Sequence, residues 1–328
     1  MDAKTAAQSA EVTRADCESL IADVQQQVAR PIEGVFGAES ITWNINRESA
    51  LFLGAGRAAL LQLAHPWVAA ALDQHSSVME KPIARFHNTF RVVFTMIFGS
   101  ADQAFRAARS LHLRHTRIRG NIPKAVTRYA AGSAYEANTT HALRWVFATL
   151  VESAVIAYEC VLPPLNDAKR DAYYIEAKTL AKLFGLSDDA LPQNWRAFKR
   201  YVEEMCQSPE LGVNDMSRAM AHRLLAGSGS WLLIPRWYRA LTAQWLPPRF
   251  VAEFELQFCS TEQERASRVQ RWLPPVYRNL PPALRFIGPY HEAQARVANH
   301  APDFVTRRSN RFWIGEARLP FCEGEDFR

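Results

Sequence analysis

Signals that start and end α-helices recur along this chain, whereas the alternation of apolar and polar residues that is typical of β-strands is nearly absent. Ser100 with Gln103 has the pattern of a capping box, and Asn166 precedes a helical pattern that ends at Gly185. Residues 139–162 are apolar nearly all round, which predicts a central helix. Further helices are predicted over residues 16–29, 101–115, 167–184, 193–206, 262–273 and 289–300. The fold class is therefore predicted to be all-α.

The chain has no internal repeat, no low-complexity tract and no linker rich in Gly and Ser, so we expect a single domain. Residues 1–15 are predicted to be a flexible N-terminus, 16–300 a single all-helical domain, and 301–328 an irregular C-terminal tail. Four proline pairs are predicted to lie in loops between helices: Pro163-Pro164, Pro247-Pro248, Pro274-Pro275 and Pro281-Pro282.

The charge is basic but dispersed. The formal net charge is +6, and only seven of the 39 basic residues are lysine. Arginine is suited to binding planar carboxylates and phosphates, because its guanidinium donates two parallel hydrogen bonds. The basic residues form no long block, so a nucleic-acid partner is not favoured.

The five cysteines lie far apart, form no CxxC pair and are odd in number. This pattern favours free thiols in a reducing compartment over a disulfide framework or a zinc–thiolate site. The first twenty residues contain no apolar run typical of a secretory signal. The best membrane candidate, residues 49–72, is interrupted by Arg57 and His65, whereas a spanning helix needs about 20 apolar residues. We therefore expect a cytoplasmic protein without a transmembrane segment.

Several common catalytic motifs are absent. The chain has no HExxH, no GxSxG and no GxxxxGK[ST]. Residues 54–59, GAGRAA, hold two glycines of a dinucleotide-binding fingerprint without the third, and no predicted strand precedes them. Nucleotide binding is therefore poorly supported, and a cysteine–histidine pair has no local signature.

Two pairs of residues share a helix face. His112 and His115 are three apart in LHLRHTRIRG, and Arg85 and Thr89 are four apart. The histidines are either ligands or the basic end of a helix, where positive charge favours the helix dipole. Arg85 and Thr89 are either a functional face or a solvated arginine beside a threonine. His75 either approaches Arg85 or is a buried, hydrogen-bonded histidine. A haem needs one imidazole, an apolar pocket and basic groups for its propionates, and this composition permits all three.

The motifs, in their order and spacing, resemble the DUF2236 family, whose members include latex-clearing rubber oxygenases and mycophenolic-acid pathway oxygenases. The resemblance covers about residues 37–298. It is carried by residues 47–76, by Arg85 with Thr89, and by the stretches 98–120, 135–146, 165–185, 191–205 and 288–297.

The resemblance implies a helix bundle enclosing a pocket for haem b. The family's histidine–glycine pattern falls on HTRIRG, which makes His115 the expected proximal iron ligand. His112, one turn earlier, would pack beside it and contribute to cofactor binding. Arg85 and Thr89 would lie on the distal side, where both would bind the cofactor and take part in catalysis with O₂.

The chain departs from the rubber-cleaving members in two places. Asn88 stands where they carry a lysine, and residues 69–72 are apolar near the place of their acid/base glutamate, with Asp73 the nearest carboxylate. We therefore expect an oxygenase acting on a small apolar or isoprenoid-like substrate. The alternatives are a non-catalytic haem- or lipid-binding helical protein, and a basic helical protein that binds anionic membranes or nucleic acid. The oligomeric state is left open, with a homodimer among the alternatives.

Overall fold

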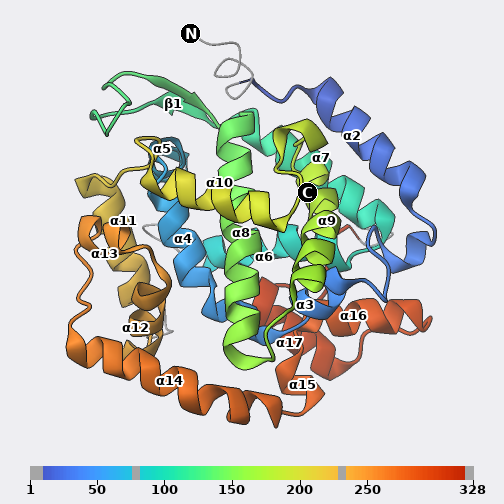
Figure 1. Cartoon of the computed structure of the whole chain (residues 1–328). Helices are drawn as coiled ribbons and strands as arrows, with labels where there is room; N and C mark the ends of the chain where they lie inside the picture. Colours follow the sequence, from blue (N-terminus) through green and yellow to red (C-terminus); the bar gives the residue numbers. More distant parts are fainter. Residues whose placement is uncertain (1–9, 76–81, 228–233, 322–328) are drawn as a thin grey trace.

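The structure is a computed structural model, and it describes residues 10–75, 82–227 and 234–321 (Figure 1). The first half contains α2 (Arg14–Gln27), α3 (Ile41–Asn46), α4 (Ala55–Leu63), α5 (Pro66–His75), α6 (Pro82–Phe98), α7 (Ala101–His115) and α8 (Thr140–Val161). The second half contains α9 (Asp167–Leu183), α10 (Trp195–Gln207), α11 (Asp215–Ala226), α12 (Arg236–Trp245), α13 (Pro248–Glu253), α14 (Ser260–Arg278), α15 (Pro282–Arg285), α16 (Gly288–Val297) and α17 (Phe304–Ile314). Short 3-10 helices span Pro31–Glu33, Ser49–Leu53 and Asp188–Ala190.

A small sheet qualifies the all-α prediction. Strands β1 (Arg119–Asn121) and β2 (Ala134–Glu136) pair antiparallel, with Gly120 opposite Tyr135. Each strand has only three residues, which is too short for an alternating pattern to stand out in the sequence. The fold is therefore largely helical, with one two-stranded hairpin following α7.

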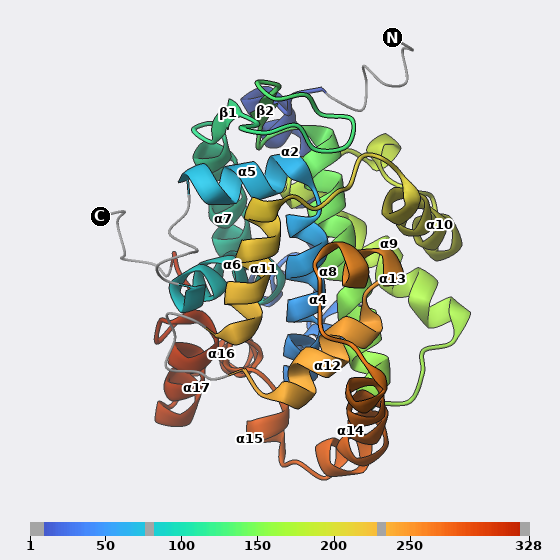
Figure 2. The same cartoon turned by 90° about the vertical axis from the view of Figure 1, so that its left-hand side faces the viewer.

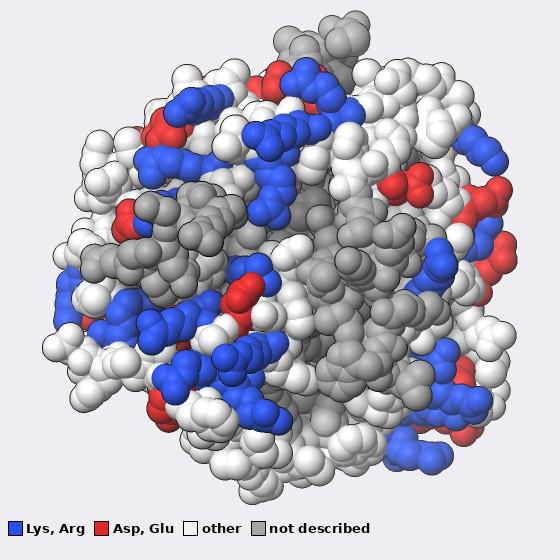
Figure 3. All heavy atoms as spheres, turned by 180° about the vertical axis from the view of Figure 1, so that it is seen from behind, with Lys and Arg blue, Asp and Glu red and all other residues white. Residues whose placement is uncertain are grey.

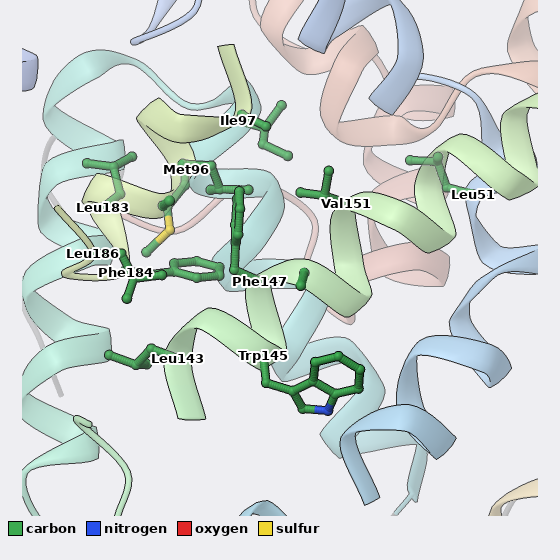
Figure 4. Packing of buried hydrophobic residues seen from close by; sticks show 14 of the residues in the cluster. Leu51, Met96, Ile97, Leu143, Trp145, Phe147, Val151, Leu183, Phe184 and Leu186 are labelled. Carbon is green, nitrogen blue, oxygen red and sulfur yellow. The ribbon is translucent and has the colours of Figure 1, made fainter. Parts of the chain in front are cut away.

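Helix α8 runs through the middle of the molecule, as its apolar sequence predicted (Figure 1). It packs along α4 and contacts α9, α10 and α14. Figure 4 shows why it is apolar all round: Phe147 points toward Met96 and Phe184, while Trp145 points to the other side of the helix. The indole Nε1 of Trp145 donates to the Leu61 carbonyl at 2.8 Å, so even its polar atom is satisfied within the core.

The predicted helix caps are confirmed. The Gln103 amide N–H donates to Ser100 Oγ at 3.3 Å, and the Ser100 amide N–H donates to Gln103 Oε1 at 2.9 Å. Asn166 Oδ1 accepts from the Lys169 amide at 2.9 Å at the start of α9. Gly185 follows that helix with φ of +92°, a conformation that favours glycine. These local interactions fix where α7 and α9 begin and end.

Two predictions about secondary structure were wrong, one at Pro274-Pro275 and one after residue 300. Pro274 and Pro275 lie inside α14 instead of in a loop. Tyr277 anchors that end of the helix, because its hydroxyl donates to Glu48 at 2.9 Å and accepts from the Ala50 amide at 3.1 Å. Such tertiary contacts outweigh the local cost of proline.

The segment after residue 300 is also not irregular throughout, because it contains α17. Asp303 caps this helix by accepting from the Thr306 amide at 2.7 Å, and Gly315, with φ of +76°, ends it. Helix α17 packs against α6 and α16. Both cap residues are visible in the sequence, so this helix was predictable. The flexible N-terminus predicted for residues 1–15 lies largely outside the described residues.

Basic side chains are spread over the surface. Figure 3 shows Lys and Arg in several groups on the face opposite to that of Figure 1, with acidic residues among them. The expectation that nucleic acid is not a partner stays a prediction. Among the helices of the described chain, none is both long and apolar enough to cross a membrane.

Candidate functional site

A cavity is lined by residues of α5, α6, α7 and α8, the helices that Figure 2 labels. Its volume is about 170 Å³. Each helix contributes residues spaced three or four apart, so each presents one stripe to the cavity. Its apolar walls are formed by Trp67, Val68, Ala71, Leu72, Val92, Val93, Leu111, Ile118, Ala142, Leu143, Val146, Leu150 and Phe184.

Thr89 and His115 both line this cavity, and both are half-buried. Thr89 belongs to the α6 stripe, and His115 is the last residue of α7, on the same face as Leu111. Helix α6 packs along α7, which brings the two stripes together. Two residues that the sequence places on separate helices therefore meet at one site.

Arg85 lies in α6, one helical turn before Thr89. The structure describes the backbone of this part of α6, and the Arg85 side chain lies outside the described residues. Its predicted role stays a prediction.

His112 does not line the cavity with His115. Burial lowers the pKa of its imidazole; Arg14 acts in the same direction, and Glu11, Glu18 and Asp16 act in the opposite direction, so the charges that affect it lie in and just before α2. Its backbone carbonyl accepts from Asn138 Nδ2 at 3.1 Å. The structure thus separates the two histidines of the motif, and it gives His112 no contact with the cavity wall.

His75 lines the cavity and is exposed to solvent, so of the alternative of a buried, hydrogen-bonded histidine only the hydrogen bond is confirmed. Its Nε2 lies 3.0 Å from the Arg119 carbonyl of β1, which holds the ring at the end of α5. Asn88 is also exposed and lines the cavity. His75 and Asn88 therefore lie where the cavity meets solvent.

The hairpin supplies two polar lining residues: Tyr135, which begins one of the stretches that carry the resemblance, and Glu136, which the sequence analysis did not single out. The Tyr135 hydroxyl donates to Gln74 Oε1 at 2.9 Å, tying β2 to α5. Gly120, the glycine of HTRIRG, lies opposite Tyr135, and a Cβ at this position would lie 2.5 Å from Gln74 Oε1 and 2.8 Å from the Tyr135 hydroxyl. The motif glycine thus allows the chain after His115 to approach the cavity wall closely.

On α4, Gln62 lines the cavity and its Nε2 donates to Thr149 Oγ1 of α8 at 3.0 Å. The motif stretches contain Gln62 and parts of the hairpin, but they did not show that these residues line the site, because that depends on packing between distant segments. Arg114 was detectable, since it shares the α7 face of Leu111 and His115.

The glycines of GAGRAA serve helix packing. A Cβ at Gly54 would lie 2.5 Å from the Ser153 carbonyl of α8, and one at Gly56 would lie 2.7 Å from Thr242 Oγ1 of α12. Arg57 between them forms a buried ion pair with Glu152, which Lys199 also contacts. Burial alone raises the pKa of Glu152, but these two cations outweigh it and lower the pKa.

The thiols are free where they are described: Cys17, Cys160, Cys206 and Cys259 form no disulfide, and Cys322 lies outside the described residues. Within residues 10–75, 82–227 and 234–321, no group of three or more His, Cys, Asp or Glu side chains is arranged to hold a metal ion. In the described part of the site, His115 is the histidine of α7 that lines the cavity.

A largely helical fold encloses a mainly apolar cavity, which Thr89 of α6 and His115 of α7 line. The chain belongs to the family described as ER-bound oxygenase mpaB/B′/rubber oxygenase, catalytic domain, whose model matches residues 42–279. This range contains all four cavity helices and ends before α15.

Two mycobacterial proteins are similar to the chain. They are uncharacterized protein Mb2261 of Mycobacterium bovis and uncharacterized protein Rv2237 of Mycobacterium tuberculosis. Each is 23% identical over 231 residues, which is 67% of this chain and 84% of the relative. No solved structure matches the chain.

Proposed function

We propose that this protein is a haem b-dependent oxygenase that acts on a small apolar or isoprenoid-like substrate in the cytoplasm. Membership of an oxygenase catalytic-domain family supports the class of reaction. The observation that carries the proposal is that His115 and Thr89, picked out by the family motifs, line one apolar cavity.

The residues present fit a haem. A b-type haem needs one axial imidazole, apolar walls for the macrocycle and polar surroundings for its carboxylates. His115 supplies an imidazole on the cavity wall, α5, α6 and α8 supply aliphatic side chains, and the solvent-facing end is polar. We therefore assign the iron to His115. His112, which does not line the cavity, has no part in this assignment.

When bound, the haem would supply the binding and activation of O₂. The chain's own residues do the rest. Thr89 offers a hydroxyl that can both donate and accept a hydrogen bond, and the role predicted for Arg85 is to hold negative charge with its guanidinium. The aliphatic walls exclude water and bind the apolar part of the substrate by the hydrophobic effect.

The departures at Asn88 and residues 69–72 bear on the substrate. Ala69 and Ala70 are buried, so this turn of α5 brings no carboxylate to the cavity, and exposed Asn88 brings no charge. A mechanism that depends on a glutamate and a lysine at these places is not available here. The carboxylate of the lining is Glu136, contributed by the hairpin.

A spectrum tests the proposal. The purified chain is expected to show a Soret band and to contain about one iron per chain, with bands that shift on reduction by dithionite. A protein that takes up no haem, either on isolation or after incubation with haem, contradicts the proposed function.

The alternative is a haem- or lipid-binding protein without catalysis, and the missing lysine and glutamate favour it. Oxygen uptake distinguishes the two, measured with a reductant and a panel of apolar alkenes. Steady uptake that depends on the alkene excludes the alternative, whereas a haem protein that consumes no oxygen with any alkene supports it.

A further inference from the structure

Arg114 lies on the cavity-lining face of α7 beside His115, and it is exposed to solvent. In the part of the chain that the structure describes, its guanidinium makes no hydrogen bond and no ion pair. Two other arginines of the same helix are paired: Arg109 with Glu18 at 2.9 Å, and Arg106 with Asp102 at 3.6 Å. A guanidinium that lines a cavity and has no protein partner there remains available to an anionic ligand.

The cavity is amphipathic along its depth. His75, Asn88 and Arg114 are the lining residues most exposed to solvent, and all three are polar. Residues deeper in the cavity, such as Leu143 and Val146 of α8, are aliphatic. Figure 4 shows Leu143 on α8 below the packed Phe147 and Phe184 of the core. A ligand that matches this arrangement has an apolar body and a polar head near solvent.

The charged residues near the solvent-facing end of the cavity indicate the charge of the ligand's polar head. Glu136, half-buried on β2, is the carboxylate of the lining, and it forms no ion pair with Arg114. Arg114 therefore presents an uncompensated, planar positive charge beside the cavity. Planar guanidinium recognises a carboxylate through two parallel hydrogen bonds.

We propose that Arg114 is a carboxylate-binding residue of this cavity, which takes an amphiphile with its apolar body between α5, α6, α7 and α8 and its carboxylate at the solvent-facing end. The identity of the ligand rests on the proposed function. If that function holds, the carboxylate is a propionate of haem. The same chemistry is offered by a long-chain fatty acid, and the experiment separates the two.

The test compares acids with their esters on the full chain freed of haem. The probes are haem b with its dimethyl ester, followed by the Soret band, and cis-parinaric acid with its methyl ester, followed by fluorescence. The wild type is expected to bind the acid of at least one pair about tenfold more tightly than its ester, in line with a charge-assisted hydrogen bond at a partly solvated site. Arg114→Met is expected to lose this preference, and Arg114→Lys to keep part of it.

Arg117→Met is the matched control, because Arg117 is exposed, lies three residues further on and does not line the cavity. It should retain the acid-over-ester preference. Equal binding of acid and ester by the wild type, or an unchanged preference in Arg114→Met, overturns the proposal. An Arg114-dependent preference for the fatty acid in a chain that binds no haem keeps this inference and contradicts the proposed function. If a variant fails to fold, the comparison of acid and ester binding by the wild type still tests the proposal.

Discussion

Thr89 on α6 and His115 at the end of α7 line one cavity, because α6 packs along α7 and each helix presents one stripe of residues to it. His112, one turn before His115, is not among the lining residues, and the charges that affect its pKa lie in and just before α2. This difference between two histidines of one motif makes the proposed cofactor site testable with single substitutions.

His115→Ala is expected to abolish haem binding, because it removes the imidazole assigned to the iron. His112→Ala is the matched control. It should retain haem, because His112, the other histidine of the motif, does not line the cavity. The measurements are the Soret absorbance per chain and the iron content after incubation with haem. Equal haem content in the two variants would show that the iron is held elsewhere.

Thr89→Val is expected to leave haem content unchanged and to lower substrate-dependent oxygen uptake by about tenfold or more, the scale expected when a positioned hydrogen-bonding group is lost. Valine matches threonine in shape but lacks the hydroxyl. Thr89→Ser, which keeps the hydroxyl, should restore most of the activity. Full activity in Thr89→Val would assign threonine a packing role only.

Glu152→Gln is expected to lower the free energy of unfolding by about 3–5 kcal/mol, because it leaves Arg57 buried without its counter-charge. The Glu152 side chain is 2% exposed and that of Arg57 is 5% exposed. Glu316→Gln makes the same chemical change in an ion pair with Arg91 in which Glu316 is 56% exposed, and it should cost about 1 kcal/mol or less. Urea unfolding of both variants checks the contrast, and equal losses would contradict it.

Gly54→Ala and Gly120→Ala test two kinds of close approach. The added methyl at Gly54 meets the backbone carbonyl of Ser153, which cannot move without shifting α8, so we expect a loss of about 2–3 kcal/mol. At Gly120 it meets the ends of the Gln74 and Tyr135 side chains, which can rotate away, so about 1 kcal/mol is expected. Thermal unfolding ranks the two variants, and the reverse order would refute this account.

Acid is expected to destabilise the fold through His65. Burial lowers the pKa of His65 to about 3, with His141 adding to the effect and Glu210 opposing it. Between its ordinary pKa of about 6.5 and this value, the unfolded chain binds a proton that the folded chain does not. The stability that His65 contributes is therefore complete above pH 6.5 and falls on acidification by up to about 1.4 kcal/mol per pH unit.

Urea unfolding between pH 7 and pH 5 measures this dependence. His65→Gln should show a shallower loss of stability with acid than the wild type, whatever its stability at pH 7. His300→Gln removes an exposed histidine and should leave the dependence unchanged. Parallel curves for wild type and His65→Gln would assign the acid sensitivity to other groups.

The sequence by itself determined the helical class, the caps at Ser100 and Asn166, and the central position of α8, because these depend on interactions between near neighbours in the chain. The order of its motifs also identified the family. Local preference was not enough at Pro274-Pro275, where the contacts of Tyr277 keep α14 helical. Only the tertiary structure decided which helices enclose the cavity, that His115 lines it while His112 does not, and that Tyr135 and Gln62 belong to its wall. These relationships join residues far apart in sequence. They are set by packing between helices, so no local sequence pattern reveals them.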